Sequence, residues 1–248
     1  WHRSFSIPIP SCRFDLNPLS AQDMQRNGKY AMSADGKIST VSGKSKWISG
    51  EKSREDVQKL RHRCMGIMTG IATVEADDPM LNCRLENGRN PVRIICDSSL
   101  KIRTDSRIVK SANKYETIIA TAFEGLADGE ITESSTEGKI KELIQKKVKI
   151  VNFCGKDKRT DLVKLMKYLH QSGIDSVLSE GGAQVNASLF RARLINEVQI
   201  YMAPKLIGAD GKSPIGIIGT DTPDAAVKLK LSKIERIDED IKIIYQVE

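Results

Sequence analysis

The sequence predicts an α/β protein with a mostly parallel central sheet, helices on both faces and an antiparallel C-terminal edge. From Lys29 onward, segments rich in β-branched residues alternate with segments whose apolar residues recur at three- and four-residue spacing. The last two strand-like segments, 228–235 and 241–247, flank the acidic turn around Asp238, which is typical of a hairpin. We therefore expect parallel strands followed by one antiparallel pair.

The expected elements follow one another in a regular order. Residues 30–32 form a short first strand, and Ser49 can cap a helix over residues 51–63. Residues 64–69 then form a buried strand. The remaining expected elements are strands at 91–97, 115–121, 148–153, 174–179 and 197–203, and helices at 73–76, 140–147, 162–169 and 183–194.

An irregular leader is expected before this domain. Residues 1–28 contain three prolines and little periodicity, which leaves residues 29–248 as a single domain. The segment Arg26-Asn27-Gly28 also lacks the apolar residues expected at the start of a buried strand. We therefore expect the first strand to be short or frayed.

Length and composition exclude several classes of protein. Of the 248 residues, 40% are hydrophobic and 29% are charged, as in ordinary globular domains. No run of about 18 apolar residues and no signal peptide can be recognised, so we expect a cytoplasmic protein without a membrane span. The five cysteines are scattered without a C-x-x-C pair and the three histidines lie far apart, which predicts neither disulfides nor a metal site.

The charge of the chain favours a small anionic ligand over nucleic acid. Its net charge is +7, with 39 basic and 32 acidic residues. The lysines are dispersed, whereas a nucleic-acid surface would gather them in one stripe with aromatic residues between them. We therefore expect no nucleic-acid partner. A mild basic excess suits a phosphorylated substrate and a phosphorylated cofactor.

One strand-to-helix junction stands out as a candidate ligand site. The stretch SEGGAQVN, residues 179–186, ends a strand in the carboxylate of Glu180, and two glycines then precede a helix. Free N–H groups at a helix start bind anions, so this stretch fits a pyrophosphate cradle. A plain tight turn is the alternative. The chain contains no G-x-G-x-x-G, so the junction is not a standard Rossmann site.

Two further junctions carry weaker signals. Within residues 70–79, Thr73 offers a hydroxyl and an N–H to a phosphate, and Asp77 could orient a ribose or nicotinamide or supply a proton. Aspartates before a proline are also a common helix end. After the strand PVRIICD, Ser98 and Lys101 suit the 2′-phosphate of NADP better than the 2′-hydroxyl of NAD.

Three side chains suit a flat ring and a phosphate. Trp47 could support a nicotinamide or pyrimidine ring, although it could equally anchor the start of the following helix. Arg61 and Arg84 are candidate phosphate ligands, because a guanidinium binds phosphate through two parallel hydrogen bonds. Singly, each arginine is more often a surface residue.

Six stretches follow one another along the chain: KYAMSADGKIST, SGKSKWISG, G-x-x-T-V-x-A-D-D-P-x-L at residues 70–81, NPVRIICDSSL, SVLSEGGAQVNASLF and VQIYMAPKLIG. Together, in this order, they resemble the reductase domain of the bifunctional riboflavin-biosynthesis deaminase/reductase. The resemblance covers residues 29–248. It implies a dihydrofolate-reductase-like fold, a homodimer, NADPH as cofactor, and a small phosphorylated pyrimidine as substrate. The implied reaction reduces the ribosyl group of 5-amino-6-(5-phosphoribosylamino)uracil to a ribityl group.

The resemblance also implies roles for particular residues. NADPH contacts are implied for Ala31, Trp47, Thr73, Asp77, Ser98, Gly182, Ala183, Gln184, Val185, Asn186, Ala187 and Ser188. Substrate contacts are implied for Ser45, Arg61, Leu81, Arg84 and Glu180, with the arginines near the phosphate and Lys29 at the edge of the site. Asp77 and Glu180 are the candidate catalytic carboxylates, which could donate or stabilise a proton as hydride reaches C1′ of a ring-opened imine.

Three alternatives stay open at this point. The reductase could act before deamination, on the 2,5-diamino-pyrimidinone phosphate, and no residue identifies the group that distinguishes the two substrates. The chain could also be a non-catalytic NADP-binding module. Residues 1–28 show no trace of the zinc deaminase of the bifunctional proteins, so we expect either a stand-alone reductase or a fragment.

Overall fold

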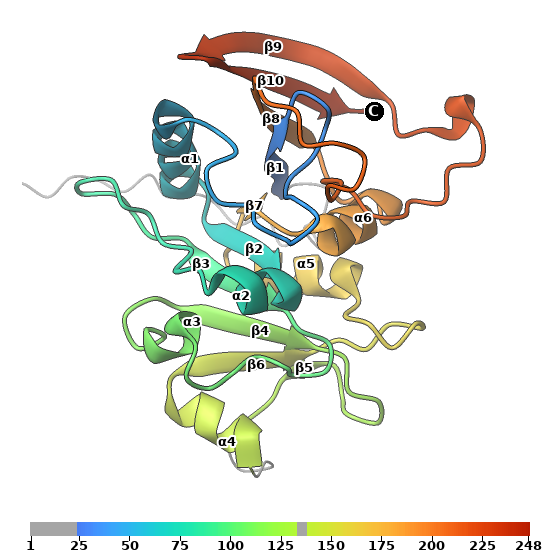
Figure 1. The fold of residues 1–248 in the computed structure, drawn as a ribbon. Coiled ribbons are helices and arrows are strands. Elements are labelled where there is room, and N and C mark those ends of the chain that lie inside the picture. Colours follow the sequence, from blue (N-terminus) through green and yellow to red (C-terminus); the bar gives the residue numbers. More distant parts are fainter. Residues whose placement is uncertain (1–23, 133–137) are drawn as a thin grey trace, which may run out of the picture.

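The computed structural model describes residues 24–132 and 138–248 and confirms the predicted α/β class (Figure 1). Its strands are β1 (Gln25–Ser33), β2 (Gly66–Gly70), β3 (Val92–Cys96), β4 (Thr117–Thr121), β5 (Gly129–Glu130), β6 (Val148–Asn152), β7 (Ser176–Ser179), β8 (Glu197–Ala203), β9 (Leu229–Ile237) and β10 (Asp240–Val247). Its helices are α1 (Glu51–Arg63), α2 (Ile71–Asp77), α3 (Arg107–Lys110), α4 (Gly138–Gln145), α5 (Leu162–Gln171) and α6 (Ala183–Arg191), with a 3₁₀ turn η2 (Pro223–Ala225).

The strands form one sheet in the order β5-β6-β4-β3-β2-β7-β1-β8-β10-β9. Every neighbouring pair from β6 to β8 is parallel. Both outer ends are antiparallel, through β5 on one side and the β9–β10 hairpin on the other. The hairpin was predicted, whereas the two-residue β5 is too short to give a sequence pattern.

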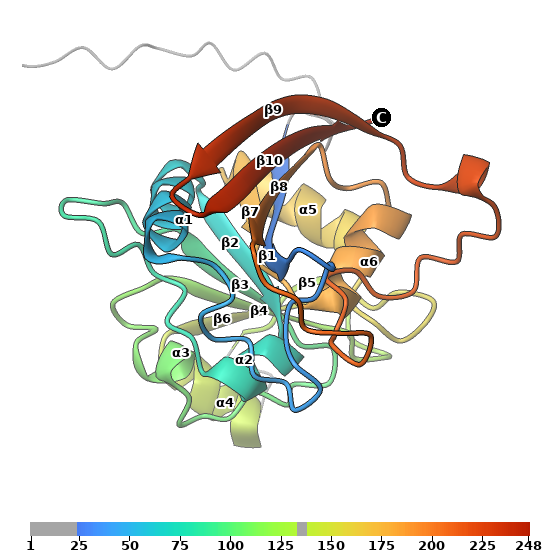
Figure 2. The same ribbon diagram turned by 45° about the horizontal axis from the view of Figure 1, so that its top comes forward.

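Helices cover both faces of the sheet, as predicted (Figure 2). Side chains of neighbouring residues along a buried strand point to opposite faces, so Met68 packs with α5 and α6 while Ile67 packs with α2, α3 and α4. Val57 and Leu60 of α1 pack against Leu178 on β7. This arrangement brings α1, α2 and the start of α6 to one edge of the sheet. No helix in the described part of the chain combines the length and apolar character that a bilayer span needs.

The first strand starts earlier than expected. The predicted leader, residues 1–28, overlaps β1, and the strand is nine residues long instead of short or frayed. Its polar start is buried because it is paired: Arg26 donates through Nε to Asn196 Oδ1 at 3.2 Å. Asn27 is also buried, and its Nδ2 donates to the Cys64 sulfur. The remainder of the predicted leader, residues 1–23, lies outside the described residues.

Helix α1 spans the predicted residues, but its cap is a different group from the one expected. Gly50 occupies the N-cap position, and no side chain caps the helix from there. Instead, Asp240 of β10 accepts hydrogen bonds from Gly50 N at 2.7 Å and Ser53 Oγ at 2.6 Å. A carboxylate beside the positive end of a helix dipole stabilises the helix, so the C-terminal hairpin completes the cap expected of Ser49.

Candidate functional site

Two adjoining cavities open at the edge of the sheet where β2 and β7 end. Their volumes are about 480 and 470 Å³. The first lies between α2 and the start of α6, and the second lies beside α1. They share the residues Lys29, Ala31, Ile38, Ser45, Asp77 and Glu180. Ligands bind at this edge of open α/β sheets, and two ligands in these cavities would meet at the shared residues.

Backbone groups form much of the first cavity. Helix α6 begins after Gly182, which has no side-chain cap, so the first N–H groups of the helix keep their hydrogen-bonding capacity. A Cβ atom added to Gly182 would lie 3.0 Å from Thr73 Oγ1. One added to Gly70 would lie 2.8 Å from Val185 Cγ2. The glycines therefore allow α2 and the start of α6 to approach closely around an opening lined with N–H donors.

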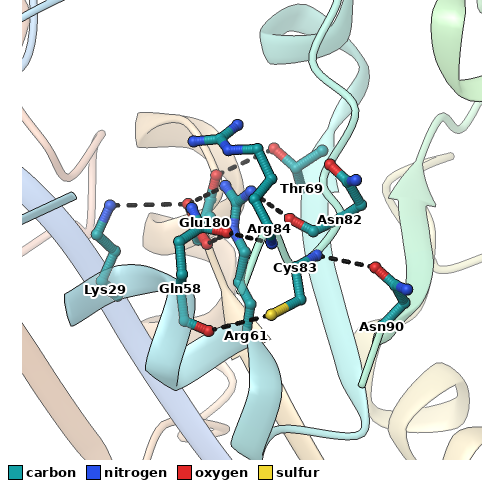
Figure 3. Close-up of polar contacts among 9 residues, drawn as sticks. All are labelled: Lys29, Gln58, Arg61, Thr69, Asn82, Cys83, Arg84, Asn90 and Glu180. Atoms are coloured by element: carbon teal, nitrogen blue, oxygen red, sulfur yellow. Dashed lines mark hydrogen bonds and ion pairs between the residues drawn. The ribbon is translucent and has the colours of Figure 1, made fainter. Parts of the chain in front are cut away.

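Seven charged side chains line the second cavity, and Figure 3 shows the contacts among three of them, Lys29, Arg61 and Glu180. Arg61 of α1 donates to Glu180 through Nε at 2.7 Å and through Nη2 at 3.0 Å. Lys29 of β1 lies on the other side, with Nζ 3.7 Å from Glu180 Oε2. The side chains of Lys29, Arg61 and Glu180 are only 14%, 12% and 11% exposed. We call these three residues the charged triad.

The triad holds Glu180 in its ionised form. Burial alone would raise the pKa of Glu180, but the charges of Arg61 and Lys29 and the hydrogen bonds they donate outweigh it and lower the pKa to about 2. Burial lowers the pKa of Lys29 from its ordinary range, and the neighbouring Glu180 only partly offsets that effect. Glu180 is thus an anion at neutral pH, and Lys29 is a stronger acid than an exposed lysine.

Two further contacts involve residues that line these cavities. Ser45 donates through Oγ to Asp77 Oδ1 at 3.3 Å, which links the loop before α1 to the end of α2. Trp47 has a positive φ of 70° and is 66% exposed as a residue, and the guanidinium carbon of Arg54 lies 4.1 Å from the ring centroid. A non-glycine residue in this region of φ is strained, and such residues are common at ligand sites.

The structure brings most of the predicted site residues to these cavities. Ala31, Ser45, Asp77 and Glu180 line both; Thr73, Gly182, Ala183, Gln184 and Val185 line the first; Trp47, Arg61 and Arg84 line the second. Five predicted residues line neither, namely Leu81, Ser98, Asn186, Ala187 and Ser188.

The residues outside the cavities have structural partners. Leu81 is buried in the core below α2. Asn186 is buried and donates through Nδ2 to Pro214 O at 2.9 Å, and Ala187 beside it is buried in α6. Ser98 lies at the end of β3 on the same edge of the sheet, where its Oγ accepts a hydrogen bond from Thr160 N at 3.0 Å.

Sequence reasoning missed two polar side chains of α1 and placed a third residue, on β1, only at the edge of the site. Arg54 and Gln58 line the second cavity, and Lys29 lies within the charged triad although the sequence indicated only an edge position. Arg54, Gln58 and Arg61 recur at four- and three-residue spacing along α1, so they share one face of the helix. That spacing was available in the sequence as a signal for the two missed residues.

The fold and these cavities define an α/β protein in which a sheet-edge cavity with an uncapped helix start adjoins a cavity lined with cations. The model of the RibD C-terminal domain family matches residues 27–243, and the chain belongs to that family.

Curated relatives agree with this assignment. The riboflavin biosynthesis protein RibD of Actinobacillus pleuropneumoniae is 44% identical over 238 residues, which cover 94% of this chain and 60% of the relative. The chain therefore spans well under two thirds of that relative's length. The 2,5-diamino-6-ribosylamino-4(3H)-pyrimidinone 5′-phosphate reductase of Methanothermobacter thermautotrophicus is 33% identical over 221 residues, covering 88% of this chain and 95% of the relative.

Two solved structures share the fold. RibD of Acinetobacter baumannii superposes with a TM-score of 0.75 at 24% identity, covering 91% of this chain and 58% of that one. The riboflavin biosynthesis reductase Rib7 of Saccharomyces cerevisiae superposes with a TM-score of 0.69 at 23% identity, covering 95% of this chain and 93% of that one.

Proposed function

We propose that the chain is an NADPH-dependent reductase of riboflavin biosynthesis. In this proposal it converts the ribosyl group of 5-amino-6-(5-phosphoribosylamino)uracil to a ribityl group. The observation that carries the proposal is the junction of the two cavities at Lys29, Asp77 and Glu180. A dinucleotide in the first cavity and a phosphorylated pyrimidine in the second would place their reacting ends side by side.

The first cavity fits a nicotinamide dinucleotide. The N–H groups at the start of α6, from Gly182 to Val185, would hold its pyrophosphate, and Thr73 would add a hydroxyl. Ser98 lines neither cavity but follows β3, the neighbour of β2, on the same edge of the sheet, so its proposed contact with NADPH requires the dinucleotide to extend beyond the first cavity. When bound, NADPH supplies the hydride.

The charged triad supports the transfer by stabilising positive charge and supplying a proton. Reduction of the ring-opened imine adds a hydride to C1′ and a proton to the adjoining nitrogen, which becomes the amine of the product. Glu180 stabilises the protonated imine instead of donating a proton, because its pKa of about 2 keeps it ionised. The lowered pKa of Lys29 suits its Nζ to deliver the proton. Arg61 keeps its own proton and holds the carboxylate in place.

A second substrate is supported by one relative. The Methanothermobacter reductase matches this chain along nearly its whole length, and its name specifies the 2,5-diamino pyrimidinone phosphate. Both substrates carry the same phosphoribosylamino group, and they differ at the pyrimidine ring. Reduction before deamination is therefore the alternative order.

The experiment that tests the function follows NADPH oxidation with the two pyrimidine phosphates supplied separately. We expect turnover of at least one of them, and the preferred substrate identifies the order of deamination and reduction. Absence of turnover with both, from folded protein that binds NADPH, would contradict the proposal and favour a non-catalytic NADP-binding module.

We further propose that the protein is a homodimer. Leu229, Leu231 and Ile234 of β9 are exposed and pair across the hairpin with apolar residues of β10, so they share one face. An apolar sheet face of this kind commonly lies in a subunit interface. Light scattering coupled to size exclusion would give twice the chain mass for a dimer and the single chain mass for a monomer.

A cytoplasmic location is also part of the proposal. Cys64, Cys83, Cys96 and Cys154 are all free thiols in the structure. Unpaired cysteines are usual in a reducing compartment, where biosynthetic NADPH is also used. Fractionation with compartment markers would test this location.

A further inference from the structure

The second cavity contains more cations than its carboxylates neutralise. It is lined by Lys29, Lys46, Arg54, Arg61 and Arg84, and by the two carboxylates of Asp77 and Glu180. Glu180 is already paired with Lys29 and Arg61. Within the described residues, Lys46, Arg54 and Arg84 form no ion pair with a carboxylate. This excess positive charge suits the phosphate of a substrate.

Arg61 already donates from all three of its guanidinium nitrogens, which leaves one N–H on each of Nη1 and Nη2 for that phosphate. Its Nε and Nη2 donate to Glu180, and its Nη1 donates to the carbonyl oxygen of Asn82 at 3.0 Å. The Nε–Nη2 edge of Arg61, which could bind a phosphate through two parallel hydrogen bonds, is already given to the buried Glu180 carboxylate. A phosphate that used this edge would leave the carboxylate without its partner, which is costly.

Arg54 keeps free the Nε–Nη2 edge that Arg61 has given to Glu180. The loop before its helix holds the side chain, because Nη1 donates to Ser49 O at 2.7 Å. The Trp47 ring lies against the guanidinium, with 4.1 Å between the guanidinium carbon and the ring centroid. Its Nε and Nη2 donate to no group among the described residues. Stacked on one face and hydrogen-bonded at one corner, Arg54 presents two fixed donors at the cavity wall.

We propose that Arg54 binds the phosphate of the substrate and makes the enzyme selective for phosphorylated over dephosphorylated substrates. This inference rests on the proposed reductase function and adds a residue to its substrate site. Arg84 is the second phosphate ligand, on the loop that faces α1. Arg54 contributes more to the selectivity than Lys46 or Arg84, because it is half-buried and held in place, whereas the other two are exposed and lose more conformational freedom on binding.

Trp47 explains why the guanidinium is held at this point. Its backbone has a positive φ and its carbonyl oxygen accepts a hydrogen bond from Lys205 Nζ at 2.7 Å. These constraints hold the largely exposed Trp47 against one face of the Arg54 guanidinium. The ring therefore orients the guanidinium edge, and a lysine at position 54 would keep the charge without the two fixed donors.

The test compares kinetics on a phosphorylated substrate and on its dephosphorylated nucleoside. The substrate is whichever pyrimidine phosphate the wild-type enzyme reduces. Arg54→Ala should raise KM for the phosphorylated substrate by about tenfold or more, with kcat unchanged, because charge-assisted hydrogen bonds are lost. KM for the nucleoside should be the same in both proteins. Arg54→Lys should restore only part of the selectivity.

The matched control is Lys52→Ala, which removes an exposed cation from the same helix outside both cavities. It should leave both KM values unchanged. An equal loss with Arg54→Ala on both substrates would overturn the proposal, because Arg54 would then act on the fold or on Trp47 alone. No change with either substrate would overturn it as well.

A binding measurement decides the case in which the wild-type enzyme reduces neither substrate. Calorimetric titration with ribose 5-phosphate tests the phosphate site without turnover. We expect binding to wild type and to Lys52→Ala, and binding about tenfold weaker to Arg54→Ala. Equal affinity of all three proteins, or no binding to wild type, would overturn the role of Arg54. Failure of turnover alone would count only against the proposed function.

Discussion

The two cavities meet at the same residues but are built by different parts of the chain. The first uses backbone groups, with an uncapped helix start and glycines that let α2 and α6 approach closely. The second uses long charged side chains from α1 and β1 that converge on Glu180. A backbone site depends on the space around it, whereas a charged site depends on a balance of charges. The two cavities should therefore respond to different kinds of substitution.

The largest effect should come from the residue on which the charges of the second cavity converge. Glu180→Gln would leave Lys29 and Arg61 buried without their carboxylate, and breaking a buried pair in this way costs about 3–5 kcal/mol. Thermal and urea unfolding should report that loss. NADPH oxidation should also fall by about a hundredfold, because the anion that stabilises the protonated imine is removed.

A surface pair provides the control for this substitution. Glu142 forms an exposed ion pair with Lys146, and Glu142→Gln should change neither unfolding nor turnover measurably. Near-wild-type activity and stability in Glu180→Gln would show that the triad is dispensable and would contradict the account of the second cavity.

The next effect is a loss of stability in acid. The folded-state pKa of Glu180 lies at about 2, below its ordinary value of 4.5, so its ionised form stabilises the fold above pH 4.5. That stabilisation should be lost as the pH falls from 4.5 towards 2. Urea unfolding across this range should show a steep decrease in the free energy of unfolding, and the decrease should be smaller in Glu180→Gln. An identical pH dependence in both proteins would contradict the assignment.

A smaller effect is expected when space is removed from the first cavity. Gly182→Ala would place a Cβ atom 3.0 Å from Thr73 Oγ1, so the start of α6 must shift away from α2. We expect NADPH affinity to fall by about tenfold, with little change in KM for the pyrimidine substrate. Fluorescence titration with NADPH would measure the change in its affinity.

The matched control for this change is Gly28→Ala, at a glycine within strand β1. A Cβ atom at Gly28 would make its nearest contact at 3.7 Å, an ordinary van der Waals distance, so Gly28→Ala should bind NADPH normally. Equal affinity of Gly182→Ala and wild type would show that close approach of the two helices is not needed for the cofactor.

The smallest predicted effect concerns the support of α1. Asp240→Ala removes the carboxylate that caps Gly50 and Ser53, which should lower the free energy of unfolding by about 1–2 kcal/mol. Because α1 supplies residues to the second cavity alone, KM for the pyrimidine substrate should rise while NADPH affinity stays unchanged. Asp238→Ala, in the exposed turn of the same hairpin, is the control. A loss of NADPH affinity in Asp240→Ala would show that the two cavities do not respond independently.

The first cavity was largely predictable because its features are local in sequence. The stretch SEGGAQVN shows the strand end, the glycines and the helix start within a few residues, and the structure places Gly182 to Val185 along the cavity. The same holds for the alternation of strands and helices that predicted the sheet. Local patterns of this kind are visible in the sequence before the chain is folded.

The second cavity was predicted less completely because its contacts join distant segments. Arg61 and Glu180 are 119 positions apart, and the cap of α1 comes from Asp240, 190 positions beyond Gly50. The sequence indicated Arg61 and Glu180 as separate candidates, without the ion pair that joins the Nε–Nη2 edge of Arg61 to the carboxylate. Sequence reasoning also ended the leader too late, because the polar residues Arg26 and Asn27 are buried through partners that no local pattern reveals.

The central claim, that hydride passes from NADPH across the junction of the two cavities, can be tested by isotope transfer. The enzyme would be incubated with NADPH carrying deuterium at the transferred position of C4 and with each pyrimidine phosphate in turn. We predict one deuterium at C1′ of the ribityl product, located by mass spectrometry and proton NMR. A product without deuterium at C1′, or no reduced product from either substrate, would contradict the account.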